Sequence, residues 1–107
     1  MRAEQLKGNL DALLLAVLAS GPAHGYAVIT DLRRRSDGAF DLPEGTVYPA
    51  LHRLERMGLL SSDWAAGATR RRRVYAITAE GRRSLTAQRR DWRRFAQGMN
   101  LVLGGAV

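Results

Sequence analysis

The sequence predicts a mainly α-helical protein with a small β-hairpin. Apolar residues recur at helical spacing in the first twenty residues, again between residues 45 and 58, and with a seven-residue period after residue 85. Two short apolar segments lie between the second and third of these ranges, on either side of a turn that contains Gly67. With 107 residues and 46% hydrophobic content, the chain is long enough for one small domain with its own core.

The first helix is predicted to be apolar on two sides. One stripe consists of Leu6, Leu10, Leu13, Leu14, Val17 and Leu18, and the opposite side of Ala12, Leu15, Ala16 and Ala19. A domain of this size covers one face of such a helix, so the second face predicts contact with another helix or another copy of the chain. Gly21 and Pro22 end the helix.

A second helix is predicted after His24 and Gly25, and it ends in the arginines 33–35, which complement the dipole of a last turn and so have a structural explanation. A third helix follows, with Pro43 at its first helical position. Its core residues are predicted to be Val47, Leu51 and Leu54, and Gly58 ends it.

Pro49 lies inside the predicted third helix and destabilises it. A proline there removes one backbone hydrogen bond and crowds the carbonyl of Gly45, at a cost of about 3 kcal/mol. A glycine at the crowded position and the nearby helix start lower this cost. We therefore retain the helix and expect a bent or loosened first turn.

The segments Leu59–Trp64 and Arg72–Thr78 predict two strands of a hairpin, with Tyr75 and Ile77 on one face. Thr78 is a good amino-terminal cap, so a last helix is expected from Ala79 to about Leu103. Along it, two seven-residue series form one apolar edge that a single glutamine interrupts, namely Leu85, Trp92 and Met99 together with Gln88, Phe95 and Val102.

A helix that ends at a glycine and leads into a hairpin with a cationic tip is the outline of a winged helix-turn-helix. The full prediction is a winged helix-turn-helix in residues 1–78 and a carboxy-terminal dimerisation helix in residues 79–107, both within one compact unit. The apolar edge of the last helix is expected to pack against a second subunit, because most of the domain is already closed.

The positive charge is concentrated in one region. Residues 70–94 carry ten arginines against Glu80 and Asp91, a net charge of +8, whereas the rest of the chain has a net charge of −1. Such a local field attracts polyanions, and arginine forks bind phosphate. For the arginines from Arg82 to Arg94, a solvated helix face is an equally good interpretation. For residues 70–73 we favour binding of duplex DNA.

Several classes of protein are disfavoured. The chain has no uncharged apolar run of about 18 residues, no secretory signal pattern and no cysteine, so we expect a cytoplasmic protein without a membrane span. It has only His24 and His52, and it lacks a carboxylate pair or a phosphate-binding glycine loop, so we expect no enzyme, cofactor or metal. A metal sensor built from these histidines matches no common ligand spacing.

Three segments resemble the PadR family of bacterial transcriptional regulators, in particular its short subfamily with a single carboxy-terminal helix. They are LLLAVLASGPAHGYAV at 13–28, GTVYPALHRLERMGLL at 45–60 and RRVYAITAEGRRSL at 72–85. The middle segment is the most specific, because amphipathicity alone does not demand its Gly-Thr-Val-Tyr-Pro start. The family carries a proline in its recognition helix, which agrees with Pro49.

The resemblance implies a homodimer that reads an operator with two-fold symmetry, usually as a repressor that a small-molecule effector releases. The alternative is a winged-helix interaction module that binds an acidic protein or RNA. The predicted DNA-binding residues come from the recognition helix, the wing and the start of the second helix. They are Thr46, Tyr48, Pro49, His52, Arg53, Arg70, Arg71, Arg72, Arg73, His24 and Tyr26.

Some of these residues have a second interpretation. Tyr48 is also a candidate core aromatic, His52 a solvated helix residue, and Tyr26 is better explained by packing against the third helix. Strand alternation places Arg71 and Arg73 on one face and Arg70 and Arg72 on the other, so one pair suffices for DNA contact. Arg53 offers a fork for phosphate or guanine.

The predicted dimer interface contains Leu10, Leu14, Leu85, Trp92, Phe95, Met99 and Val102. Relatives with a tryptophan at the position of Trp92 stack flat aromatic ligands on it. Carried over, this implies a pocket for a small planar or hydrophobic effector, lined by Trp92, Gln88, Ala96, Leu15 and Asp11. A plain hydrophobic seam around Trp92 is the other interpretation.

Overall fold

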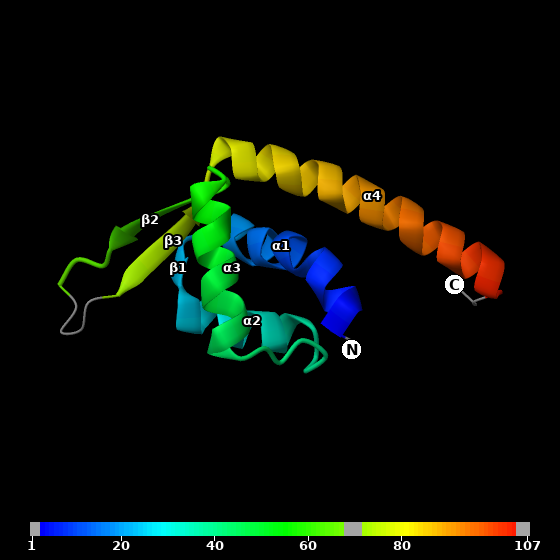
Figure 1. Ribbon diagram of the computed structural model, residues 1–107, viewed down its shortest axis with the longest axis horizontal. Coiled ribbons are helices and arrows are strands. Elements are labelled where there is room, and N and C mark those ends of the chain that lie inside the picture. The colour runs from blue at the N-terminus through cyan, green and yellow to red at the C-terminus, as the bar shows by residue number, and fades with distance from the viewer. Residues whose placement is uncertain (1–2, 68–71, 105–107) are drawn as a thin grey trace.

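The computed structural model describes residues 3–67 and 72–104. Within them the elements follow in the order α1 (Ala3–Ala19), β1 (Ala23–His24), α2 (Gly25–Arg35), α3 (Glu44–Arg56), β2 (Leu60–Trp64), β3 (Arg73–Ile77) and α4 (Ala79–Leu103). Figure 1 shows α1, α2 and α3 grouped beside the sheet, with the β2–β3 hairpin projecting on one side and α4 on the other. The predicted class, mainly helical with a small β-sheet, is confirmed.

The sheet has one strand more than the sequence predicts. Its order is β1-β3-β2, and both pairings are antiparallel. The two-residue β1 pairs with β3 through Ala23 opposite Tyr75 and His24 opposite Val74. A strand this short has no alternation to detect, which is why only the β2–β3 hairpin was predictable. β1 fixes the start of α2 against the base of the hairpin.

The start of α3 differs from the prediction by one residue. Pro43 is the N-cap in extended conformation instead of the first helical residue. Its carbonyl accepts hydrogen bonds from the N–H groups of Thr46 at 3.0 Å and Val47 at 3.2 Å. The helix then runs through Pro49 to Arg56, so the predicted helix is confirmed.

The core contains residues from one side of every helix. It consists of Leu10, Leu14, Leu15, Val17, Leu18, Val28, Leu32, Val47, Ala50, Leu51, Leu54, Leu60, Tyr75 and Leu85. The last of these, Leu85, lies in the second turn of α4, and no described residue beyond it belongs to the core. The winged part of the molecule is therefore closed on itself before α4 is half complete.

The junction between the winged part and α4 is closely packed. The Thr78 hydroxyl accepts the Gly81 N–H at 3.0 Å, which confirms the predicted cap, and it donates to the Gly58 carbonyl at 2.7 Å. A Cβ at Gly81 would lie 2.2 Å from the Leu59 carbonyl oxygen. Only a glycine permits this approach, so the first turn of α4 is set against the segment that joins α3 to β2.

The end of α4, residues 91–103, is called the distal helix below. It extends beyond the other elements (Figure 1), and the molecule as a whole measures 53 × 27 × 21 Å along its principal axes. Its large apolar side chains are exposed: Trp92, Phe95, Met99, Leu101, Val102 and Leu103. In the described part of the chain, no helix combines the length and apolar character that crossing a membrane requires.

Candidate nucleic-acid interface

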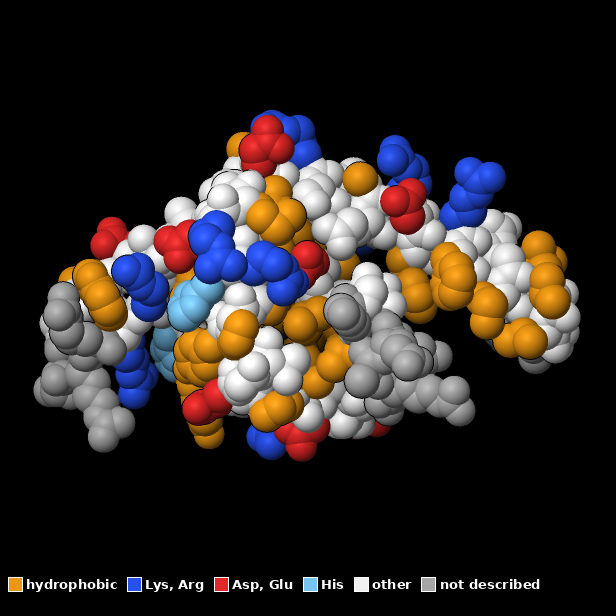
Figure 2. Space-filling view, viewed as in Figure 1, with side chains coloured by type: hydrophobic (Ala, Val, Ile, Leu, Met, Phe, Trp, Pro, Cys, Tyr) orange, Lys and Arg blue, Asp and Glu red, His pale blue; other side chains and the backbone are white. Residues whose placement is uncertain are grey.

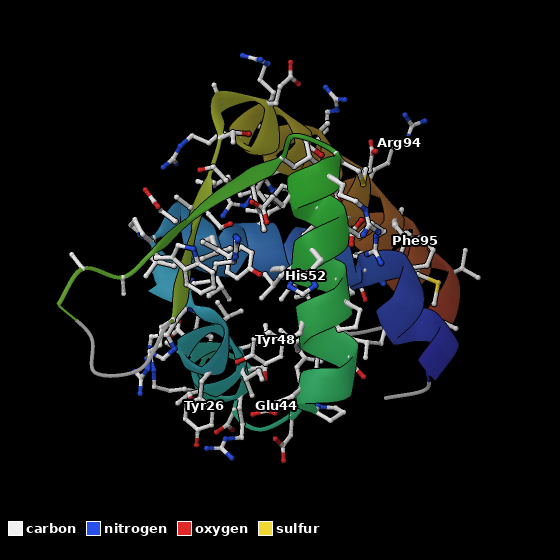
Figure 3. All side chains as sticks on the ribbon, turned by 60° about the vertical axis from the view of Figure 1, so that its left-hand side comes forward. Tyr26, Glu44, Tyr48, His52, Arg94 and Phe95 are labelled. Atoms are coloured by element: carbon white, nitrogen blue, oxygen red, sulfur yellow. The ribbon has the colours of Figure 1, made fainter. Side chains whose placement is uncertain are left out.

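A groove of about 620 Å³, the wing groove, lies between the start of α2, the exposed side of α3 and the hairpin. It is lined by His24, Gly25, Tyr26, Tyr48, His52, Trp64, Arg72, Arg73 and Tyr75. In Figure 3, Tyr48 and His52 project from α3, and Tyr26 lies at the lower end of α2. Six of the predicted DNA-binding residues are thus brought to one surface from three separate segments of the chain.

Tyr48 is positioned by a glycine of the neighbouring helix. A Cβ at Gly25 would lie 2.4 Å from the Cε1 atom of the Tyr48 ring, so the ring rests directly on the backbone of α2. Gly25 is buried and Tyr48 is half-buried. The tyrosine therefore packs between two helices and also borders the wing groove, so both sequence interpretations of Tyr48 remain compatible with its place.

His24 has its two ring nitrogens in different environments. Its Nδ1 accepts the N–H of Ala27 at 3.3 Å, which caps the start of α2. Because Nδ1 is an acceptor, Nε2 carries the proton in the neutral ring. Nε2 lies 3.4 Å from Nη1 of Arg72, which is also a donor. Two donors therefore converge beside the positive end of the α2 dipole, an arrangement that suits an anionic oxygen.

The two described arginines of the wing differ in their surroundings. Arg73 lies over the Trp64 ring, 4.7 Å from its centroid, and donates to the Ser62 hydroxyl at 3.1 Å. Ser62 in turn donates to the Glu55 carboxylate at 2.5 Å. Arg73 is thereby held on the sheet, whereas Arg72 is exposed and reaches His24. Arg70 and Arg71 lie outside the described residues.

Tyr75 lies under the groove and belongs to the core. Its ring centroid is 6.4 Å from that of His52, and its side chain is 1% exposed. Burial, and after it the negative charge of Glu55, raises the pKa of the Tyr75 phenol above its ordinary value. The neutral phenol is thereby favoured, and Tyr75 forms the floor of the wing groove beneath His52.

The exposed face of α3 carries most of the other predicted residues. Pro49 and His52 are exposed, and Thr46 is half-buried. Arg53 is turned toward α1, where its guanidinium is ion-paired with Asp11. Arg56 is also exposed, one turn after His52, and it is not among the predicted residues because a last-turn arginine has a sufficient explanation in the helix dipole.

The structure corrects the interpretation of Tyr26. The sequence favours packing of Tyr26 against the third helix, but its side chain is 62% exposed. The core positions of α2 are Gly25, Val28 and Leu32, which places Tyr26 on the outward side of the helix. Packing against α3 is therefore wrong, and the tyrosine remains available at the rim of the wing groove.

The second surface is a groove of about 430 Å³ between α1 and α4, called the α1–α4 groove below. It is lined by Asn9, Ala12, Leu13, Ala16, Phe40, Leu85, Gln88, Arg89, Trp92 and Arg93. Two of the predicted effector residues, Trp92 and Gln88, border it. Ala96 does not, Leu15 is fully buried in the core, and Asp11 is engaged with Arg53. Leu15 and Asp11 are corrected because α1 turns its Ala12 side to this groove, and Ala96 because the α4 residues of the groove run only from Leu85 to Arg93.

The predicted dimer interface also needs correction. Leu10, Leu14 and Leu85 are 8%, 0% and 3% exposed, so they are already buried within one chain and are not free to contact another. Trp92, Phe95, Met99 and Val102 are exposed on the distal helix, where Figure 2 shows a strip of hydrophobic side chains. The Trp92 and Phe95 rings lie 5.7 Å apart, centroid to centroid.

Residues 14–87 match the family described as transcriptional regulator PadR-like. The chain belongs to this family of transcriptional regulators.

Relatives and solved structures agree with this assignment. The transcriptional regulator Rv3488 of Mycobacterium tuberculosis is 40% identical over 87 residues, which are 81% of this chain and 76% of the relative. A PadR family transcription regulator from Clostridium difficile is similar in structure, with a TM-score of 0.79 at 32% identity, covering 89% of this chain and 98% of the other. A transcriptional regulator from Clostridium thermocellum has a TM-score of 0.85 at 28% identity, covering 94% and 95%.

For this PadR-like regulator, the family match spans the wing groove and the first turns of α4 but not the distal helix. The matched range therefore contains every described residue of the wing groove. The exposed apolar strip of the distal helix lies entirely outside it. Within the described residues, no three potential ligands among His, Cys, Asp and Glu are grouped for a metal ion.

Proposed function

We propose that this regulator binds double-stranded DNA through the wing groove and the exposed face of α3. The observation that carries the proposal is the convergence of two donors, His24 Nε2 and Arg72, at the start of α2 and beside the exposed part of α3. A backbone phosphate bound there would place the start of α3 near the base edges of the major groove.

The individual contacts follow from side-chain chemistry. Thr46 and Tyr48 offer hydroxyl groups to phosphate, and Pro49 offers an apolar surface to a thymine methyl group. His52 is exposed beside them and completes the same face. The wing arginines are expected to bind phosphates or to enter a narrow minor groove.

We further propose that the protein is a homodimer in which residues 79–107 join two DNA-binding units formed by residues 1–78. Support comes from the distal helix, where exposed apolar side chains form one strip on an otherwise arginine-rich helix (Figure 2). Exposed apolar patches of this kind mark interaction surfaces. Two recognition helices related by a dyad would read half-sites about 10 base pairs apart.

The regulatory part of the proposal is a repressor that a small planar or hydrophobic effector releases. The α1–α4 groove supports it, because Trp92 offers an aromatic face and Leu13, Ala16 and Phe40 offer apolar walls. An effector bound there would contact both the helix that carries the dimer strip and the helix that packs on α3.

Electrophoretic mobility shift measurements test DNA binding. The probes are the duplex upstream of the protein's own gene and a shuffled duplex of equal length and composition. We expect saturable, sequence-dependent binding by the wild type. Arg72→Ala should weaken it and lower the salt slope by about 0.9, the effect of one lost phosphate contact. Arg83→Ala removes the same charge from the exposed side of α4, where Arg83 pairs with Glu80, and should change neither quantity.

Uniform weak binding to both probes would reject the proposal in favour of the alternative, a winged-helix module for an acidic protein or RNA. A second measurement addresses the effector. Planar dyes are titrated against the fluorescence of Trp64→Phe, which leaves Trp92 as the emitting tryptophan. We expect quenching that Leu13→Arg, a substitution in the groove wall, abolishes; equal quenching in both proteins would reject the α1–α4 groove as the site.

A further inference from the structure

Arg53 of α3 does not extend freely toward solvent, as a base-reading arginine would. Its guanidinium is ion-paired with the carboxylate of Asp11 on α1, 42 positions earlier in the chain. Pro49 lies one turn before Arg53 on the same side of α3, and Pro49 is exposed. The pair therefore borders the face that the proposed function assigns to DNA.

The pair is solvent-accessible on both sides. The side chains of Arg53 and Asp11 are 46% and 33% exposed, respectively. A DNA phosphate accepts the same fork of donors as a carboxylate, so it must compete with Asp11 for the guanidinium. Asp11 is already in place beside Arg53 and cancels its charge, so the pair as a whole gives a phosphate little net attraction.

The position of Asp11 in α1 is defined by its neighbours. Leu10 and Leu14 are buried in the core, and these anchors hold α1 in its orientation beside α3. The Asp11 carboxylate is consequently held at the flank of the recognition helix, and it neutralises one arginine there. Without that carboxylate, the flank would carry an unpaired positive charge beside any bound duplex.

We propose that Asp11 is a specificity-determining residue that keeps Arg53 from binding the phosphates of DNA of any sequence. The proposal rests on the proposed DNA-binding function. Phosphate contacts raise affinity for all sequences alike, and discrimination comes from base contacts and DNA shape. An arginine withheld from phosphate therefore lowers non-specific binding and increases the ratio of operator binding to random-sequence binding.

The test is a double-mutant cycle in DNA binding, measured by fluorescence anisotropy over a series of salt concentrations. The proteins are the wild type, Asp11→Asn, Arg53→Ala and the double variant, each with the upstream duplex and a random duplex of equal length. Asp11→Asn is isosteric at a partly exposed site, so the fold is retained. We expect it to raise affinity for random DNA several-fold and to steepen the salt slope by about 0.9.

The two other variants of the cycle show whether the change in affinity depends on Arg53. Arg53→Ala alone should leave the slope on random DNA near that of the wild type, because the arginine is already neutralised. The double variant should match Arg53→Ala. The ratio of upstream to random affinity should fall only in Asp11→Asn with Arg53 intact.

Glu44→Gln is the matched control. Glu44 lies at the start of α3 (Figure 3), it is exposed, and it forms no ion pair within the described residues. Its neutralisation removes the same charge near DNA, so any gain in affinity should be equal with and without Arg53. If Asp11→Asn also acts equally in both backgrounds, or leaves the slope unchanged, the inference is overturned while DNA binding stands. Failure of the wild type to bind either duplex would overturn the proposed function, and the inference with it.

Discussion

The winged part of the molecule and the distal helix use apolar residues in opposite ways. Leu14, Leu51 and Leu54 are fully buried among α1, α2, α3 and the sheet. On the distal helix, Phe95 is 58% exposed and Val102 is 86% exposed, although their hydrophobicity is similar. Both regions have a regular apolar pattern, so the pattern alone does not distinguish a core from an interface. The difference arises because other elements of the chain surround the first region and none of the described elements covers the second.

The largest difference between the two regions is expected when one leucine side chain is truncated in each and the free energy of unfolding is measured. Leu54→Ala leaves a cavity beneath the last turn of α3, where the side chain is 0% exposed, and should lower the free energy of unfolding by about 2–5 kcal/mol. Leu101→Ala removes the same atoms from a side chain that is 77% exposed and lies outside the two heptad series. Urea unfolding should show a change within about 0.5 kcal/mol for that control. Equal losses would mean that the distal helix is packed in solution.

The junction between the two regions gives the next prediction. Gly81→Ala places a Cβ 2.2 Å from the Leu59 carbonyl oxygen and 2.7 Å from Ile77 Cγ1, so α4 must move away from the segment before β2 and from the end of β3. We expect the free energy of unfolding to fall by about 1–3 kcal/mol, as for other overpacked sites. Gly98→Ala adds a methyl group in open space on the same helix and should raise stability by about 0.5–1 kcal/mol through helix propensity. A stable Gly81→Ala protein would show that the junction is loose.

A substitution in the distal helix should change self-association and leave the free energy of unfolding unchanged. Trp92→Ala removes a 53% exposed indole that lies beside the Phe95 ring. Because Trp92 is a large aromatic at the centre of the proposed interface, its loss should weaken self-association by about 2 kcal/mol, roughly 30-fold in Kd. Sedimentation equilibrium measures this change, and urea unfolding at monomeric concentrations should not detect it. An unchanged association constant would remove Trp92 from the dimer interface.

The smallest effect is expected at Gly25, where the backbone of α2 supports a side chain that is proposed to bind DNA. Gly25→Ala displaces the Tyr48 ring, which lies 2.4 Å from the new Cβ, and should reduce DNA affinity about 10-fold, or 1.4 kcal/mol. The ring is a side chain and can rotate away, so the cost to folding should be minor. Gly8→Ala, in open space on α1, is the control and should not affect binding. If Gly25→Ala binds DNA like the wild type, the placement of Tyr48 on α2 has no part in recognition.

The elements were predictable where their signals are local. The Thr78 cap, the span of α4 and the hairpin strands all follow from residues within a few positions of each other, and the structure confirms them with one-residue differences at strand ends. β1 was not predictable, because two residues have no periodicity and the strand exists only through its pairing with β3. Tyr26 and Leu15 were assigned to the wrong environments, since neither reveals from its own neighbours which side of its helix the core occupies.

By itself, the sequence of this protein determined the helices, the hairpin, the arginine-rich region and the family, because helix periodicity, capping and charge are short-range properties of a chain. Tertiary structure alone decided which apolar residues become core, which arginine faces the wing groove and which is paired with an acid. Those outcomes depend on distant segments that meet in space, such as Asp11 with Arg53 and His24 with Arg72. The physical reason is that burial and ion pairing act between surfaces, and surfaces exist only after the helices have packed.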